Sequence, residues 1–482
     1  MRKKITFVHH PFIVIRCFVL LVMLCITLAA RAQTSASVPF TDLPGLPVDQ
    51  PQSGRITALI EAVNSGDRDF VLAFVKDNFT PRFREEIPDA QQADILLDIG
   101  RRNRGYELYG LRTYDPPKPP TNRTVIVRSR LLETWEAFVL EFEPDAPYRI
   151  DRLNMSLARP PAGKQSNEPL TLEQAAEQLK AFLDRLSKAD AFSGSALLAK
   201  DGKFIFTFVS GEASKAFAAP NNLDTKFNLG SMNKMFTAIA IAQLVEAGNP
   251  PVSFDDPVGK YLSSDWLASD AREKITIAQL LSHTSGLGSH FTDEFWKSSR
   301  ELYRGLDDFK PLIVNQSPEF EPGTKWAYSN SGFLLLGAVI EKVTGQSYDD
   351  YVREHITRPA GMTSTACYEM HIDTPNLAIG YSYEMGPDGT GGRWVNNLFK
   401  HVIKGGSAGG GFSTTPDLLR FDQALRRGKL VSTEMLNTLW TPKPASPNYG
   451  YGFQLDGPPN DRIVGHGGGF PGISSVLDMY LD

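Results

Sequence analysis

The stretch Phe227-Asn228-Leu229-Gly230-Ser231-Met232-Asn233-Lys234-Met235-Phe236 decides how this chain folds around its chemistry. It ends a short extended run and begins a long apolar helix pattern. A hydroxyl and an amine three residues apart at a helix start lie on one face of its first turn. A nucleophilic serine needs such a base close enough to take its proton. Ser231-x-x-Lys234 is the only pair with this spacing, but the spacing alone is weak evidence and requires support from the rest of the chain.

The N-terminal 32 residues predict export. Basic residues at positions 2–4 precede an uncharged apolar run from Cys17 to Ala30, and Ala30-Arg31-Ala32 has the small-x-small pattern of a signal cleavage site. The run is shorter than the ~20 residues that a membrane span needs, which disfavours an uncleaved anchor. We therefore expect residues 1–32 to be a signal peptide, and the mature protein to be periplasmic or extracellular without a membrane span.

The composition is that of a globular protein, with 41% hydrophobic and 22% charged residues. Residues 1–32 contain five basic residues and no acidic one, so their removal changes the net charge from −5 to −10. This acidic balance without a basic patch excludes nucleic acid as a partner. Two of the three cysteines leave with the signal, so the remaining Cys367 has no partner for an internal disulfide and is expected to be a buried small residue.

Shifts in composition divide the exported chain into four parts. Residues 33–53 are rich in Ser, Pro and Gly and predict a flexible lead-in. Residues 54–158 combine two amphipathic helix patterns with four strand-like runs, which is typical of a small α+β domain. This part resembles the nuclear-transport-factor-2-like accessory domains, although no motif secures the likeness, and its protein partner is unknown. Residues 159–170 predict a linker, and residues 171–482 a second domain; strand-like sequence is still running at the end, which suggests a truncated C-terminus.

The second domain has an α/β pattern. An amphipathic helix is followed by a hairpin whose turn is Asp201-Gly202, and the helix of Ser231 comes next. Further apolar patterns predict helices at 275–282 and 332–344 and, near the end, strands at 449–455, 463–466 and 472–481.

Three downstream stretches support the Ser231 pattern. They are Thr276–Leu287 (TIAQLLSHTSGL), Glu321-Pro322-Gly323 with Tyr328-Ser329-Asn330-Ser331-Gly332, and Gly465-His466-Gly467-Gly468-Gly469. In this order and spacing they resemble the serine β-lactamase and penicillin-binding-protein superfamily, closest to its class C β-lactamase-related branch. The resemblance covers about residues 172–482. It implies an α/β (α+β) fold in which an antiparallel sheet flanked by helices packs against an all-helical subdomain, with the site at their junction.

The resemblance implies a role for each matching residue. Ser231 would be the nucleophile, Lys234 its activating neighbour, and Tyr328 a partner in the general-base work. Asn330 would hold Lys234 and the substrate amide, and the backbone N–H of Gly469 would pair with that of Ser231 as an oxyanion hole. A lysine acts as a base only when its pKa falls, as burial makes it do. Two groups that share one proton titrate as a pair, so the pattern leaves open which of Lys234 and Tyr328 is neutral.

The segment His466-Gly467-Gly468 stands where the family usually has Lys-Thr-Gly. The glycines would allow a substrate backbone to lie against the strand, so we expect His466, Gly467 and Gly468 to bind substrate. A histidine of ordinary pKa, near 6.5, is only partly cationic at pH 7 and meets the carboxylate of a β-lactam less well than a lysine. The substitution therefore favours an esterase or peptidase over an efficient β-lactamase.

A different hydrolase constellation is disfavoured by its order in the chain. Gly405–Gly409 matches G-x-S-x-G with Ser407 as nucleophile, but an α/β-hydrolase needs its His-Gly run ahead of that serine, whereas here the run follows it. The glycines also continue past Ser407, where a helix should begin.

His283, His290 and Asp293 match no metal-binding motif, so we expect His283 to be structural and predict no metal and no cofactor. The sequence thus predicts an exported serine hydrolase that acts through a Ser231 acyl-enzyme on an ester, peptide or amide. The alternative is a catalytically silent binding or sensing module with the same fold.

Overall fold

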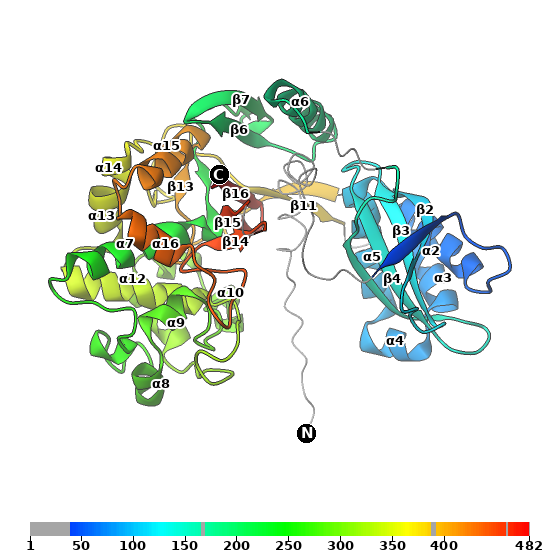
Figure 1. Ribbon diagram of the computed structural model, residues 1–482, viewed down its shortest axis with the longest axis horizontal. Coiled ribbons are helices and arrows are strands. Elements are labelled where there is room, and N and C mark those ends of the chain that lie inside the picture. The colour runs from blue at the N-terminus through cyan, green and yellow to red at the C-terminus, as the bar shows by residue number, and fades with distance from the viewer. Residues whose placement is uncertain (1–38, 165–168, 387–391, 459–460, 482) are drawn as a thin grey trace. The chain divides into compact units, whose positions relative to one another are not determined.

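The computed structural model of the protein describes residues 39–164, 169–386, 392–458 and 461–481. The predicted signal peptide at 1–32 and the chain end at Asp482 lie outside the described residues. Internal contacts divide the chain into two compact units. Residues 39–192 with Tyr383–Arg393 belong to the N-terminal unit, and Ser193–Ser382 with residues 394–481 belong to the large unit. Figure 1 shows the elements of each.

The N-terminal unit is built on an antiparallel sheet whose strands lie side by side in chain order. The strands are β1 (Phe40–Pro44), β2 (Tyr106–Tyr114), β3 (Asn122–Ser129), β4 (Trp135–Phe142) and β5 (Ile150–Leu157). The helices are α2 (Ser53–Ser65), α3 (Arg68–Asn78), α4 (Pro81–Glu86), α5 (Asp89–Asn103) and α6 (Leu172–Lys188). Apolar side chains of α2–α5 pack with those of β2–β5 into one buried core, as expected of a small α+β fold.

The segment expected to be a flexible lead-in is ordered in part, because it contains β1. This strand pairs with β2 along its whole length. The Arg112 guanidinium donates to both carboxylate oxygens of Asp42, at 2.7 and 2.9 Å, and lies 4.0 Å from the centroid of the Phe40 ring. These contacts join residues 70 positions apart, so the composition of the segment could not reveal them.

Helix α6 groups with the N-terminal unit by its contacts, whereas the sequence assigns residues from 171 onward to the second domain. A capping box of Thr171 and Gln174 begins the helix. Near its end, Arg185 Nε donates to the Leu131 carbonyl oxygen at 2.9 Å.

Two buried helices form the centre of the large unit, α7 (Asn233–Ala247) and α12 (Asn330–Thr344). Nearly every side chain of α7 from Asn233 to Leu244 is buried, so this helix is surrounded by protein on all faces. The surrounding helices are η1 (Gly230–Met232), η2 (Val258–Lys260), α8 (Ser269–Lys274), α9 (Ile277–Leu281), α10 (Asp293–Lys297), η3 (Arg300–Leu302), η4 (Leu306–Phe309), α11 (Lys310–Ile313), α13 (Tyr348–Val352), η5 (Arg353–Thr357), α14 (Arg358–Ala360), α15 (Thr415–Arg426) and α16 (Thr433–Leu439).

Antiparallel strands complete the fold. A three-stranded sheet contains β14 (Gln454–Asp456), β15 (Ile463–Phe470) and β16 (Ile473–Tyr480). The other strands pair two by two: β6 (Gly194–Lys200) with β7 (Lys203–Ser210), β8 (Glu212–Ser214) with β9 (Ala219–Pro220), β10 (Phe227–Asn228) with β13 (Phe412–Ser413), and β11 (Tyr381–Met385) with β12 (Gly392–Asn396). Antiparallel strands combined with a largely helical part confirm the predicted fold class. None of the described helices combines the length and apolar character of a membrane span.

Strand β15 passes against the backbone that precedes Ser231. A Cβ on Gly468 would lie 1.9 Å from the Leu229 carbonyl oxygen, and one on Gly230 would lie 2.8 Å from the Gly469 nitrogen. Gly230 also has a φ of 50°, in the left-handed region that favours glycine. The glycines of this region therefore allow backbone to meet backbone beside the serine.

We expect Gly468→Ala to lower the free energy of unfolding by about 1–3 kcal/mol or more, because the added methyl group would overlap the Leu229 oxygen. Gly288→Ala is the matched control, since a Cβ there would meet nothing within 4 Å. Urea-induced unfolding followed by circular dichroism would check this. Equal unfolding midpoints for the two variants would contradict the close approach of β15.

Candidate active site

Ser231 lies at the start of the central helix, where the sequence placed it. It sits in the single turn η1, which runs directly into α7, and the Gly230 N–H before it donates to Asn228 Oδ1 at 2.8 Å. The serine is partly exposed, whereas Gly230 and Met232 on either side are buried. The fold therefore presents this hydroxyl at the surface of an otherwise buried turn.

Lys234, one turn further along, is fully buried. Its Nζ donates to Asn330 Oδ1 at 2.8 Å and to the Ala408 carbonyl oxygen. The amine also lies 4.9 Å from the centroid of the Tyr328 ring. Burial lowers the pKa of Lys234 well below its ordinary value of 10.5, because the charged form loses its hydration. The neutral amine is the form that can accept a proton.

Tyr328 and Asn330 are positioned by the beginning of α12. Ser329 is the N-cap of this helix: its hydroxyl accepts the Gly332 N–H at 2.9 Å and donates to the Gly288 carbonyl oxygen. Asn330 is the first helical residue, and its Nδ2 donates to Ser289 Oγ at 3.2 Å. One helix start thus aims the amide oxygen at Lys234 and holds the phenol ring beside the amine.

His283 contacts both the N-cap residue of α12 and the Tyr328 ring. Its Nδ1 accepts the Ser329 N–H at 3.1 Å, and its ring centroid lies 4.3 Å from that of Tyr328 and 4.6 Å from that of Tyr449. Burial lowers the pKa of His283 well below its usual value, and the charge of Lys234 adds to this effect. A neutral, buried imidazole that accepts a backbone N–H agrees with the structural role expected from the sequence.

The predicted oxyanion donors lie in touching backbone segments. Because the Gly469 nitrogen is 2.8 Å from where a Gly230 Cβ would be, β15 lies directly beside the peptide that leads into Ser231. The hydroxyl of Ser475 in β16 donates to the Leu229 carbonyl oxygen at 2.7 Å and ties the sheet to the same turn. The arrangement brings Ser231 and Gly469 together, as an oxyanion hole formed by two backbone N–H groups requires.

The imidazole of His466 is engaged within the protein. Its side chain is only 1% exposed. Nδ1 donates to the Gly467 carbonyl oxygen, and Nε2 lies 2.9 Å from the Tyr449 hydroxyl. The Gly467 N–H in turn donates to Gln454 Oε1 at 2.9 Å. The ring is thus held by Gly467 and Tyr449, and its centroid also lies 6.5 Å from that of Tyr328. The role of His466 in substrate binding stays a prediction.

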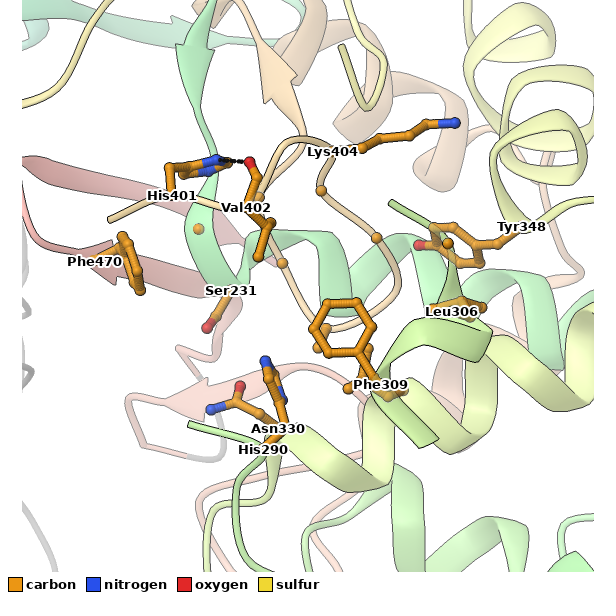
Figure 2. A pocket seen from close by; sticks show the side chains of 18 of the residues that line it. Ser231, His290, Leu306, Phe309, Asn330, Tyr348, His401, Val402, Lys404 and Phe470 are labelled. Carbon is orange, nitrogen blue, oxygen red and sulfur yellow. Dashed lines mark hydrogen bonds between the residues drawn. The ribbon is translucent and has the colours of Figure 1, made fainter. Parts of the chain in front are cut away.

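A cavity of about 180 Å³ begins beside Ser231 and continues along the Gly405–Gly410 loop. Figure 2 shows Ser231 and Phe470 on one side of it and Tyr348 and Lys404 on the other. Of the predicted site residues, the cavity is lined by Ser231, Asn330 and Gly469. The side chains of Lys234 and Tyr328 lie behind Ser231 and Asn330 in the contacts given above.

The sequence did not identify several residues of the cavity wall. His290, His401 and the Gly405–Gly410 loop were assigned no role, yet all line the cavity. His401 Nδ1 donates to the Val402 carbonyl oxygen, and its Nε2 accepts from Asn228 Nδ2 at 2.7 Å (Figure 2). Phe470 directly follows the predicted Gly469, so the glycine motif indicated its position.

Ser407, the alternative nucleophile, is completely buried and lies between the bridged residues Gly406 and Gly409, and α15 begins only at Thr415. Within the described ranges, no three His, Cys, Asp or Glu side chains are grouped so that they could hold a metal ion.

The sheet, the helical part and the serine–lysine turn define a β-lactamase/transpeptidase-like fold, and comparison with known proteins agrees. A family model described as Beta-lactamase matches residues 173–479, well over half of the chain, so the chain belongs to the Beta-lactamase family. Penicillin-binding protein 4* of Bacillus subtilis (strain 168) is 31% identical over 326 residues, which are 64% of this chain and 69% of that protein.

Solved structures give the same result. A penicillin-binding protein from Bacillus halodurans is 32% identical and superposes with a TM-score of 0.55, covering 62% of this chain and 90% of that one. A D-stereospecific amidohydrolase from Streptomyces sp. is 29% identical with a TM-score of 0.50, covering 61% and 87%. These similarities confirm the superfamily, while its class C branch stays a prediction.

The buried Lys234 amine should make stability depend on pH. Unfolding returns the lysine to a pKa of about 10.5, whereas its pKa in the folded protein lies well below that. Between the two values only the unfolded chain binds the proton, so this lysine makes the free energy of unfolding rise with pH by about 1.4 kcal/mol per unit. We expect the unaltered protein to gain stability relative to Lys234→Met as the pH rises toward 10.5, the ordinary pKa of a lysine.

Urea unfolding of both proteins at several pH values would measure this difference. Lys234→Met is suited to the comparison because methionine fills a similar volume without a titrating group. A stability difference that does not change with pH would mean that the folded protein keeps the amine protonated throughout this range.

Proposed function

We propose that the chain is an exported serine hydrolase that cleaves an ester, peptide or amide through an acyl intermediate on Ser231. The observation that carries the proposal is the desolvated amine of Lys234, one helical turn from a partly exposed serine hydroxyl. A buried lysine without an acidic partner at its amine is costly to maintain. This energetic cost is explained if the Lys234 amine accepts the proton of the serine hydroxyl.

The hydrogen bonds of Lys234 support this role. A neutral amine has two N–H groups and one lone pair. Asn330 Oδ1 and the Ala408 carbonyl oxygen engage the two N–H groups, so the lone pair is the part left to accept a proton. The Tyr328 phenol lies beside the amine and would exchange the proton with it, so that Lys234 and Tyr328 act as one coupled base.

The proposed reaction has two halves. In the first, Ser231 Oγ bonds to the substrate carbonyl carbon while its proton passes to the Lys234–Tyr328 pair. The N–H groups of Ser231 and Gly469 would stabilise the oxyanion, and the same proton then passes to the leaving group as its bond to carbon breaks. In the second half, water attacks the ester carbon, gives a proton to the pair, and releases Ser231 with its proton restored.

Substrate binding would involve Asn330 and the glycines of strand β15. We assign Asn330 to the substrate amide or carbonyl, and Gly467 and Gly468 to the part of β15 against which a substrate chain would lie. His466 would contribute through its backbone, because its ring is occupied by Tyr449 and Gly467. The names of the relatives, penicillin-binding protein and D-stereospecific amidohydrolase, suggest peptide-like amides among the candidates.

The other parts of the chain extend the proposal. Residues 1–32 would direct export to the periplasm or the extracellular space and then be removed. Residues 54–158 would be an accessory domain of the nuclear-transport-factor-2-like kind, joined to the hydrolase domain by the 159–170 linker. Its five-stranded sheet covered by helices supports this assignment.

A fluorophosphonate probe should label Ser231 and no other serine. Peptide mapping of the labelled protein would locate the adduct, and Ser231→Ala should lose the label. Ser407→Ala is the matched control, because Ser407 is buried outside the proposed chemistry, and this variant should keep it. Labelling at Ser407, or labelling that survives Ser231→Ala, would refute the assignment; an intact fold that takes no label would favour a silent binding module.

We expect kcat/KM for p-nitrophenyl esters to exceed that for cephalosporins by roughly tenfold or more, since one hydrogen bond to a charged group contributes about 1.5–3 kcal/mol. The reason is that His466 replaces the family's lysine and has both ring nitrogens engaged. Steady-state kinetics on the two substrate classes would test this. Comparable values would mean that another group meets the β-lactam carboxylate.

A further inference from the structure

The cavity beside Ser231 continues into a chamber with apolar walls. Its apolar lining includes Phe291, Phe295, Leu306, Phe309, Leu334 and Val402. Its lining also includes two cations and two carboxylates; of these, Lys404 is ion-paired with Asp349 and lies on the side away from Ser231 in Figure 2. In Figure 2 the Phe309 ring stands between Ser231 and the far side at Tyr348. A group that enters from Ser231 therefore meets an uncharged, mainly aromatic surface first.

His290 is the polar exception in this apolar part. It is 4% exposed, and its Nδ1 has no hydrogen-bond partner among the described residues. Its ring packs 4.2 Å from the Phe291 centroid and 5.1 Å from the Phe309 centroid. Burial, and then the charge of Lys234, lower the pKa of His290 to about 3, so the imidazole is neutral at physiological pH. His290 is therefore a neutral polar side chain held among aromatic rings.

The same histidine is tied to the catalytic network through its neighbour. Ser289 Oγ accepts from Asn330 Nδ2, and the Ser289 carbonyl oxygen accepts from Gln316 Nε2. Asn330 in turn accepts from Lys234. The residue before His290 is therefore held by two hydrogen bonds, and Figure 2 shows the His290 ring at the Ser231 end of the chamber.

We propose that this chamber is the acyl subsite of the hydrolase, and that it takes an uncharged, mainly apolar acyl group carrying one hydroxyl or amide that hydrogen-bonds to His290. The inference rests on the proposed function, because it needs Ser231 to be acylated. The acyl group stays attached to Ser231 after the leaving group departs, so an interior chamber that begins at this serine suits the retained part. The His290 imidazole lines the chamber among phenyl rings and supplies a polar contact there.

The test uses three p-nitrophenyl esters with one leaving group: phenylacetate, 3-hydroxyphenylacetate and 4-hydroxyphenylacetate. The ring hydroxyl is separated from the reacting carbonyl by a methylene group, so it changes the intrinsic reactivity little. We expect one hydroxyl isomer to have a kcat/KM about three- to tenfold above that of phenylacetate, the range that one net hydrogen bond provides. His290→Phe should abolish this preference by lowering kcat/KM for the preferred hydroxyl isomer to that for phenylacetate, and His290→Gln should restore part of it.

The matched control is His371→Phe, which changes an exposed histidine outside the cavity and should keep the preference. Every variant is first titrated with the fluorophosphonate probe. An unaltered protein that takes no label at Ser231 refutes the proposed function itself. If labelling is normal, three outcomes overturn the acyl-subsite inference alone: equal kcat/KM for the three esters, a preference that survives His290→Phe, or equal losses on all three esters in both His290 variants.

Discussion

The large unit depends on holding one amine, that of Lys234, away from water. The amine comes from the first turn of α7, and its acceptors come from α12 and the Gly405–Gly410 loop, 96 and 174 positions further along the chain. Withdrawal from water favours the neutral form of a lysine, and the two acceptors orient that form. The contacts that join these three segments therefore also set the protonation state of the proposed base.

The predictions from the sequence succeeded where the signal is local. The strands of the N-terminal sheet alternate within single runs, and the Asp201-Gly202 turn closes the β6–β7 hairpin as expected. The serine–lysine spacing at a helix start was equally local, because one turn of α7 fixes it. The Tyr328–Asn330 stretch was predicted with the help of the family resemblance, and the N-cap at Ser329 explains physically why a helix begins there.

The features that the sequence missed depend on contacts between distant segments. β1 is held by Arg112, 70 positions along the chain from Asp42, and the Gly405–Gly410 loop contributes to the lining of the cavity beside Ser231. The surroundings of His466 are an example. Alternation along β15 shows that its side chain must point to one face of the sheet, but only the folded chain shows that Tyr449 and Tyr328 lie near its ring. No periodicity contains that information.

The groups around Ser231 are buried and uncharged, and this property bears on which substrates we expect the site to favour. His283 accepts a backbone N–H, His466 lies between Gly467 and Tyr449, and the neutral His290 packs among phenyl rings. Lys404, a cation of the cavity wall, lies on the side away from Ser231 and is paired (Figure 2).

A neutral carbonyl group would enter such a site without first giving up the hydration of a charge, whereas a carboxylate beside the serine would lose hydration that no cation near Ser231 among the described residues replaces. In the proposed reaction, the charge that develops on the carbonyl oxygen would meet the backbone N–H groups of Ser231 and Gly469, and their stabilisation would be concentrated in the transition state. The burial that neutralises Lys234 thus favours uncharged acyl groups by the same physical effect.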